Sequence, residues 1–251
     1  MGTADPRALW ERVADDLRAE INRGDLKAGD PISPEQELAD RHRVSRQTVR
    51  QALQQLTNEG LLLSGRGRGR TVRSQTRLHW QLSHFETQER HSAEADAWSN
   101  GVADQGRNPH QDVTVEINVP TPKVAERLGL NQDDLVVVRR RVRYVDDQAF
   151  QLADSYFPES IARGTLLMQP RDVSVPGGIL ASIGYPQVKI VDEIEIRMPT
   201  KEESSKLGIA AGTPVAEHVR TGYGEDGKPL RVMITIVPGD RHVLVYELEA
   251  Q

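Results

Sequence analysis

The run of residues 44–72, VSRQTVRQALQQLTNEGLLLSGRGRGRTV, constrains the fold of this chain more than any other segment. Its apolar side chains follow the i, i+3, i+4, i+7 spacing of a helix with one buried face: Val49, Ala52, Leu53 and Leu56. Ser45 is a suitable helix cap, and Gly60 ends the pattern. We therefore predict an amphipathic helix that begins after Ser45 and ends before Gly60.

The opposite face of this helix is rich in arginine and glutamine: Arg46, Gln47, Arg50, Gln51 and Gln54. These two side-chain types form paired hydrogen bonds with the edges of guanine and adenine in the DNA major groove. An ordinary solvated helix face would look the same in isolation. The residues that follow the helix favour the DNA interpretation.

After the helix, two short β-prone runs, LLLS and RTV, enclose a ladder of alternating glycine and arginine. This pattern predicts a two-stranded wing, with Arg66, Arg68 and Arg70 placed to meet phosphates or the minor groove. The ladder is not a phosphate-binding P-loop, because no lysine followed by serine or threonine completes it.

Two further helices are predicted upstream. The first would begin at Asp5-Pro6 and end at Gly24, with a buried side that repeats every four residues: Leu9, Val13, Leu17 and Ile21. Ser33-Pro34 would cap and begin the second, a short helix with its own apolar side. Because a tight RHRVS turn joins this helix to the arginine-rich one, the sequence predicts a winged helix-turn-helix.

The net charge of −5 would argue against DNA binding if it were spread evenly, but it is not. Residues 1–77 hold 14 Lys/Arg and 11 Asp/Glu, a balance of +3, whereas the remaining residues hold 18 and 26, a balance of −8. Charges more than about 8 Å apart are largely screened at physiological salt, so a phosphate near the basic segment meets a local positive excess.

Composition and spacing exclude several kinds of site. The chain has no cysteine, which excludes disulfides, thiolate metal sites and cysteine nucleophiles. His79, His84 and His91 are not spaced as a zinc pair on one helix, so we expect no metal and no cofactor. The sequence has no apolar run of membrane-spanning length and no secretory signal pattern. We therefore expect a cytoplasmic protein without membrane association.

The run from Ile32 to Val72 resembles the winged helix-turn-helix of the GntR family of bacterial transcription regulators. The family pattern includes V-S-R-x-T-V-R-x-A-L-x-x-L-x-x-E-G-L and then G-x-G-x-x-V. The resemblance implies contacts to double-stranded DNA from the start of the recognition helix and from the wing tip: Ser45, Arg46, Thr48, Arg50, Arg66, Gly67 and Arg68. Gln47 lies on the same predicted helix face. Gln36 stands where the family often has a DNA-contacting arginine, so that contact is expected to be altered.

From residue 111 the chain shows two similar halves. Each half reads as a strand, a short helix that ends in Leu-Gly, and two strands joined by a turn, with the first turn at Asp146-Asp147. The pattern predicts an internal duplication that builds one antiparallel sheet with helices alongside, an α+β domain.

The repeated pattern resembles the UTRA effector-binding domain of the HutC subfamily, which has a chorismate-lyase-like fold, from about Trp80 to Glu249. We predict a DNA-binding domain at residues 1–73, a linker at 74–109 and the UTRA domain at 110–251. The linker is expected to carry some local structure, with Trp80, Phe85 and Trp98 docking it on its neighbours.

The resemblance also implies that a pair of arginines before the first hairpin turn, here Arg141 and Arg143, binds an anionic effector. The period of two in a strand places Arg139 on the same face, and three guanidiniums are costly to bury without anions. Ion pairs with acidic residues of neighbouring strands explain the three arginines equally well; the candidates are Asp154, Glu193 and Glu195.

Relatives that bind phosphosugars often have glutamates where this chain has Ala153 and Arg231, so an amino-sugar phosphate is not expected. The remaining candidates for the effector pocket are Ser155, Tyr156, Tyr223 and Arg231.

Together these features predict a homodimeric repressor that reads an inverted repeat in DNA and responds to a small effector. An enzyme that uses the lyase-like fold is one alternative, although the sequence has no G-x-S-x-G elbow, H-E-x-x-H motif or dinucleotide fingerprint. A DNA-binding protein without an effector is another, against which the large second domain argues.

Overall fold

The computed structural model describes residues 8–65, 69–73, 77–83, 95–131, 133–210 and 212–248. The chain forms two compact units, and the first boundary along the chain lies between Thr76 and Arg77. None of the helices in these residue ranges has both the length and the apolar character of a membrane span.

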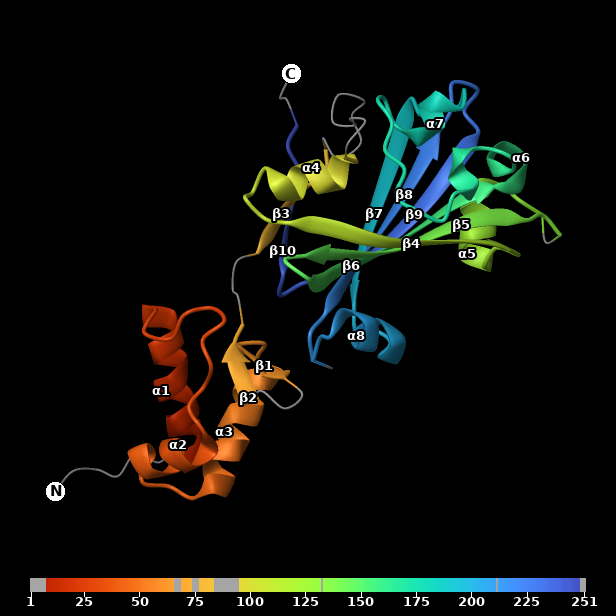
Figure 1. Ribbon diagram of the computed structural model, residues 1–251. Helices are drawn as coiled ribbons and strands as arrows, with labels where there is room; N and C mark the ends of the chain where they lie inside the picture. The colour runs from red at the N-terminus through yellow and green to blue at the C-terminus, as the bar shows by residue number, and fades with distance from the viewer. Residues whose placement is uncertain are drawn as a thin grey trace. The chain divides into compact units, whose positions relative to one another are not determined.

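The N-terminal unit contains three helices and a two-stranded sheet (Figure 1): α1 (Leu9–Arg23), α2 (Glu35–His42), α3 (Arg46–Asn58), β1 (Leu62–Gly65) and β2 (Gly69–Val72). The strands pair antiparallel, with Leu62 opposite Val72 and Gly65 opposite Gly69. The apolar stripes of α1 and α3 form one core together with Leu38 of α2 and Val72 of β2. This is the predicted winged helix-turn-helix.

The helix starts confirm one prediction and correct two. Ser45 caps α3, since its Oγ accepts a hydrogen bond from the Thr48 N–H at 3.1 Å. The predicted start of α1 at Asp5-Pro6 is wrong, because α1 begins at Leu9 with Ala8 as its N-cap. For α2 the N-cap is Pro34 rather than Ser33, and no side chain caps this helix.

The C-terminal unit is built on a six-stranded antiparallel sheet in the order β4-β5-β6-β9-β8-β7 (Figure 1). The strands are β4 (Pro109–Asn118), β5 (Val136–Val145), β6 (Gln148–Pro158), β7 (Lys189–Arg197), β8 (Val215–Tyr223) and β9 (Pro229–Pro238). The helices α5 (Pro122–Leu128) and α8 (Lys201–Leu207) follow β4 and β7, so each half repeats strand, helix and hairpin, and β6 pairs with β9 at the centre. The predicted duplication is therefore present in the topology.

The first hairpin turns as predicted at Asp146 and Asp147, whose φ angles are 49° and 63°. Two consecutive left-handed residues are the requirement of a type I′ turn, and aspartate tolerates that conformation better than most residues. The turn and a bulge, where the pairing shifts between Arg143 and Tyr144, together set the register of β5 against β6. They thereby fix which β5 arginines lie on each face of the sheet.

Side chains alternate between the two faces of this sheet. On the helix face, Val124 and Leu128 of α5 pack against Val138 of β5 and Val232 of β9. The pocket face is covered by four short helical elements and by a strand pair. These elements are α4 (Ala97–Ala103), α6 (Glu159–Ala162), the 3-10 turn Leu166–Met168, α7 (Ile179–Ser182), and β3 (Leu78–Gln81) with β10 (His242–Val245).

Within the predicted linker, residues 74–109, the described ranges 77–83 and 95–109 contain β3, α4 and the first residue of β4. β3 pairs in parallel with β10, and α4 carries Trp98 into the same buried cluster as Trp80 of β3. The expectation that these two tryptophans dock the segment is confirmed, whereas Phe85 lies outside the described residues. This segment is part of the C-terminal unit.

His242 makes the C-terminal unit sensitive to acid. The side chain is buried; its Nδ1–H donates to the Pro238 carbonyl at 3.1 Å, and its Nε2 accepts from the Gln151 amide at 3.3 Å. Burial, with the charge of Arg241 beside it, lowers the pKa of His242 to about 3.

The pKa of a histidine in an unfolded chain is about 6.5. Between about pH 3 and pH 6.5, His242 is therefore protonated in the unfolded chain but neutral in the folded one. We expect the free energy of unfolding to fall by about 1.4 kcal/mol for each pH unit in that window as the pH drops. In the His242→Gln variant, the free energy of unfolding measured with urea should no longer show this part of its dependence on pH. His110→Gln, which alters a half-exposed histidine, should keep it; equal slopes in the two variants would contradict the assignment.

Candidate DNA interface and effector pocket

The start of α3 presents the predicted DNA-contacting side chains on one exposed surface, which we call the reading face: Ser45, Arg46, Gln47, Thr48 and Arg50. The Arg46 and Arg50 side chains are 61% and 55% exposed, while the other side of α3 is buried in the core. The Ser45 and Thr48 hydroxyls lie 2.8 Å apart and stabilise the helix start. Long cationic side chains are therefore held on a rigid, capped helix end.

Glu35 gathers three arginines at this surface. Its carboxylate accepts a hydrogen bond from Arg50 Nη2 at 2.9 Å and forms longer ion pairs with Arg46 at 3.9 Å and Arg70 at 3.6 Å. The hydrogen bond from Arg50 is the largest cause that lowers the pKa of Glu35. Sequence reasoning did not assign Glu35 a role, because its partners lie in two other elements, α3 and β2.

The other four predicted DNA contacts are Gln36 and three residues of the wing tip. Gln36 lies on α2, and its amide donates to Asp40 at 3.0 Å. The wing-tip residues Arg66, Gly67 and Arg68 lie outside the described residues, although the wing strands on either side of them pair as predicted.

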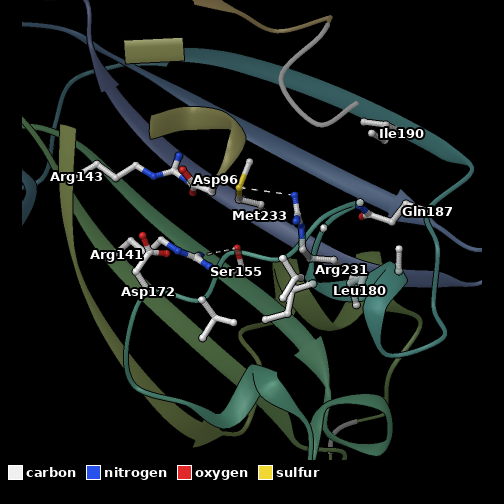
Figure 2. A pocket seen from close by; sticks show the side chains of 16 residues that line it. Asp96, Arg141, Arg143, Ser155, Asp172, Leu180, Gln187, Ile190, Arg231 and Met233 are labelled. Atoms are coloured by element: carbon white, nitrogen blue, oxygen red, sulfur yellow. Dashed lines mark hydrogen bonds and ion pairs between the residues drawn. The ribbon is translucent and has the colours of Figure 1, made fainter. Parts of the chain in front are cut away.

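In the C-terminal unit, the pocket face of the sheet contains a cavity of about 100 Å³, the arginine pocket (Figure 2). Side chains from β5, β6 and β9 form its floor: Arg141, Arg143, Ser155, Arg231 and Met233. The segment 172–181 and residues Asp96, Gln187 and Ile190 supply the walls. Four of the six predicted effector residues, Arg141, Arg143, Ser155 and Arg231, therefore line one cavity.

The arginines of this pocket have different partners. Arg143 is buried, donates to Gln111 Oε1 at 3.2 Å, pairs with Asp96 at 3.4 Å and lies over the Trp98 ring. Burial opposes ionisation of Asp96, but the charge of Arg143 and hydrogen bonds from Ser99 outweigh it and lower the Asp96 pKa. Arg143 is thus neutralised within the protein.

Arg141 is partly buried and donates to the Ser155 hydroxyl at 3.2 Å. Arg231 lines the same cavity from β9, where one of its Nη atoms lies 3.8 Å from the Met233 sulfur. Both guanidiniums therefore place positive charge at the cavity.

Arg139 is a structural residue. It is buried and donates to the carbonyls of Leu167 at 2.8 Å, Gln169 at 2.7 Å and Arg171 at 2.9 Å. Burial, with the charge of Arg141, lowers the pKa of Arg139 to about 10. Its hydrogen bonds fix the chain just before the segment that walls the arginine pocket.

The alternative that acidic residues on neighbouring strands neutralise these arginines is wrong for the three named carboxylates. Asp154 pairs with Arg140 on the helix face, and Glu193 pairs with Arg127 of α5. Glu195 alternates with Ile194 and Ile196 and so also lies on the helix face.

Two predicted effector residues do not reach the arginine pocket. Tyr156 follows Ser155 in β6, so it points to the helix face, where its hydroxyl donates to Asp154 at 3.4 Å. Tyr223 also lies on the helix face and packs beneath the Lys189 ammonium at 5.4 Å. Because adjacent strand residues point in opposite directions, Tyr156 cannot share a cavity with Ser155.

Gln187 is a pocket residue that sequence reasoning missed. Its Oε1 is buried without a hydrogen-bond partner in the described part of the chain, and a Cβ built on Gly222 would lie only 1.7 Å from that oxygen. The glycine therefore makes room for the amide. Asp96 and Asp172, which also line the pocket, were missed because they come from segments without a regular pattern.

Within the described residues, no group of three His, Cys, Asp or Glu side chains is arranged to hold a metal ion. Of the three histidines considered from the sequence, His84 and His91 lie outside those residues, and His79 is exposed on β3.

A helix-turn-helix with a wing and a separate domain with a polar cavity together define a regulator of transcription. Residues 9–72 match the model of the gntR family of bacterial regulatory proteins, and residues 104–243 match the UTRA domain. The chain belongs to the GntR family, in the HutC subfamily that combines these two domains.

Individual relatives agree with this assignment. The chain is 29% identical over 244 residues to the HTH-type transcriptional repressor NagR of Bacillus subtilis, covering 97% of this chain and 96% of that protein. It is 29% identical over 226 residues to MngR of Escherichia coli, the mannosyl-D-glycerate transport/metabolism system repressor, covering 88% of each. These relatives are regulators of transcription, and this chain is likewise a regulator and not an enzyme.

Among solved structures, PhnF from Mycobacterium smegmatis has the same fold, with a TM-score of 0.60 and 23% identity. The alignment covers 95% of this chain and all of that one. Each of the two domains therefore has the fold found in that structure.

Proposed function

We propose that this regulator is a homodimeric repressor that reads an inverted repeat in DNA, and that a small anion bound in the arginine pocket changes its affinity for that operator. The observation that carries the proposal is an exposed arginine reading face in one unit combined with an arginine-lined cavity in the other. The repressor names of two relatives support the direction of regulation.

The lining of the pocket suggests the chemistry of the effector. Arg141, Arg143 and Arg231 all line this cavity against the single paired carboxylate of Asp96, and such a concentration of guanidiniums attracts a carboxylate or a phosphate. Asp172 and the Gln187 Oε1, which has no hydrogen-bond partner among the described residues, are acceptors on the same cavity. They favour a ligand that also carries hydroxyl or amine groups.

The size of the pocket limits the effector further. A cavity of about 150 Å³ accommodates benzene, so the volume of about 100 Å³ fits a compact organic anion.

Regulation requires the effector to bind two states of the protein with different affinities, and the coupling is reciprocal. If the effector releases the repressor, a saturating operator must weaken effector binding by the same factor. Equal operator affinity with and without saturating effector would instead indicate a ligand-independent DNA-binding protein.

The first test is selection of bound sequences from a random DNA pool by the full chain at about 150 mM salt, because affinities without a stated salt cannot be interpreted. We expect a palindrome with two short half-sites. Binding without a consensus, both alone and with a panel of small carboxylates and phosphates, would overturn the proposal.

A further inference from the structure

The outer edge of the C-terminal sheet carries an unusual apolar stripe. β7 is the last strand of the sheet, and no strand of the described chain pairs with its outer side. Its pocket-face positions, continued by one residue at each end, are apolar and exposed apart from Asp192: Val188, Ile190, Ile194, Ile196 and Met198. Exposed, apolar edge strands tend to pair with another strand, and native proteins usually protect them.

We propose that this edge, the β7 edge (residues 188–197), pairs antiparallel with the β7 edge of a second copy of the chain. This inference rests on the proposed dimeric regulator and assigns the surface that holds its C-terminal units together.

The charges and the apolar positions of β7 together favour one self-pairing register. When Asp192 lies on the two-fold axis, Lys189 of each copy faces Glu195 of the other. Neither side chain has an ion-pair partner within its own described chain. The same register pairs four of the five apolar positions with one another, Ile190 with Ile194 and Val188 with Ile196.

Two neighbouring registers place like charges opposite one another. An axis at Glu193 sets Lys189 against Arg197 and Glu193 against itself, and an axis at Ile194 sets Glu193 against Glu195. In the favoured register the two Asp192 residues approach the axis. Each Asp192 is turned inward, however, and accepts from Arg220 Nε and Nη2 at 2.7 Å and from His218 at 2.9 Å.

The proposed interface would border the arginine pocket. Ile190 lines that pocket and would also face Ile194 of the partner copy. Asp192 ties the same strand to Arg220, which donates to the Leu82 carbonyl at 2.7 Å beside β3. A ligand that moves Ile190 would therefore act on the contact between the two copies.

The first test is the oligomeric state of the full chain, measured by sedimentation equilibrium without DNA. We expect the wild type to dimerise and Ile196→Asp to raise the dimer dissociation constant at least about tenfold, since it places a charge in an apolar cross-strand pair. Val119→Asp is the matched control, because Val119 is 62% exposed against 68% for Ile196 and lies at the end of β4, the other edge strand.

A charge exchange tests the register. Lys189→Glu and Glu195→Lys should each weaken the dimer, because each puts like charges opposite one another, and the double variant should regain most of the wild-type affinity. Glu195→Lys leaves the contact between Lys189 and Tyr223 intact, so its effect reports the pairing alone.

The outcomes separate this inference from the proposed function. A wild type that stays monomeric at all concentrations would overturn both. If the Ile196→Asp and Val119→Asp variants dimerise equally tightly, the β7 edge is not the dimer interface. The proposal of a dimeric repressor would still stand. Failure of the double variant to recover would overturn the register.

Discussion

Replacing Arg46 with alanine will weaken operator binding by about 1–3 kcal/mol for each half-site and relax the choice of base at one position. Arg46 stands at the start of α3 with an exposed side chain and only a long ion pair to Glu35, so its guanidinium is available for a base edge. The measurement is fluorescence anisotropy at one salt concentration, with the selected operator and its single-base variants.

Arg23→Ala is the matched control for this prediction. Its side chain is 61% exposed, as is that of Arg46, but it lies in the last turn of α1 and pairs with Asp25. We expect operator affinity and base preference to stay close to wild type. If Arg46→Ala instead weakens all DNA sequences equally, Arg46 holds a phosphate and not a base.

Replacing Arg141 with glutamine will weaken the effector by about 10- to 100-fold while leaving the operator affinity of the effector-free protein unchanged. The reason is that a hydrogen bond to a charged group contributes about 1.5–3 kcal/mol, and Arg141 offers such bonds beside the Ser155 hydroxyl. Small carboxylates and phosphates that stabilise the wild type against thermal unfolding supply the ligands, and calorimetric titration measures the change.

Arg140→Gln is the control, because Arg140 is the next residue of the same strand and points to the helix face. Its loss leaves Asp154 without its ion pair, but burial already raises the pKa of that carboxyl, so the group can become neutral. Ligand affinity should stay near wild type in this variant. Equal losses in the two variants would show that the effector does not occupy the arginine pocket.

Local patterns predicted most of the fold. The cap at Ser45, the paired wing strands, the turn at Asp146-Asp147 and the duplicated halves all depend on residues close together in the sequence. The strand β3 was not predicted, because it is held by β10, whose residues follow about 160 positions later. A short strand with a distant parallel partner has no periodic signal of its own.

The arginine pocket was predicted only in part for the same reason. Arg141, Arg143, Ser155 and Arg231 lie on regular strands, where spacing and the family resemblance identify them. Tyr156 was included although strand alternation excludes it from the cavity that Ser155 lines. Asp96 and Gln187 reach the cavity from irregular segments, so only the folded chain shows them there.

The carboxylate of Glu35 has a consequence for how the reading face searches DNA. Three arginines share this one carboxylate, so the protein carries a tethered counter-ion at the place where DNA phosphates would bind. A released salt ion diffuses away and gains entropy, whereas a displaced carboxylate stays nearby and competes for the same arginines. The tethered carboxylate therefore weakens the attraction of the reading face to DNA phosphates of any sequence. A larger share of the affinity for the operator must then come from contacts with its base edges.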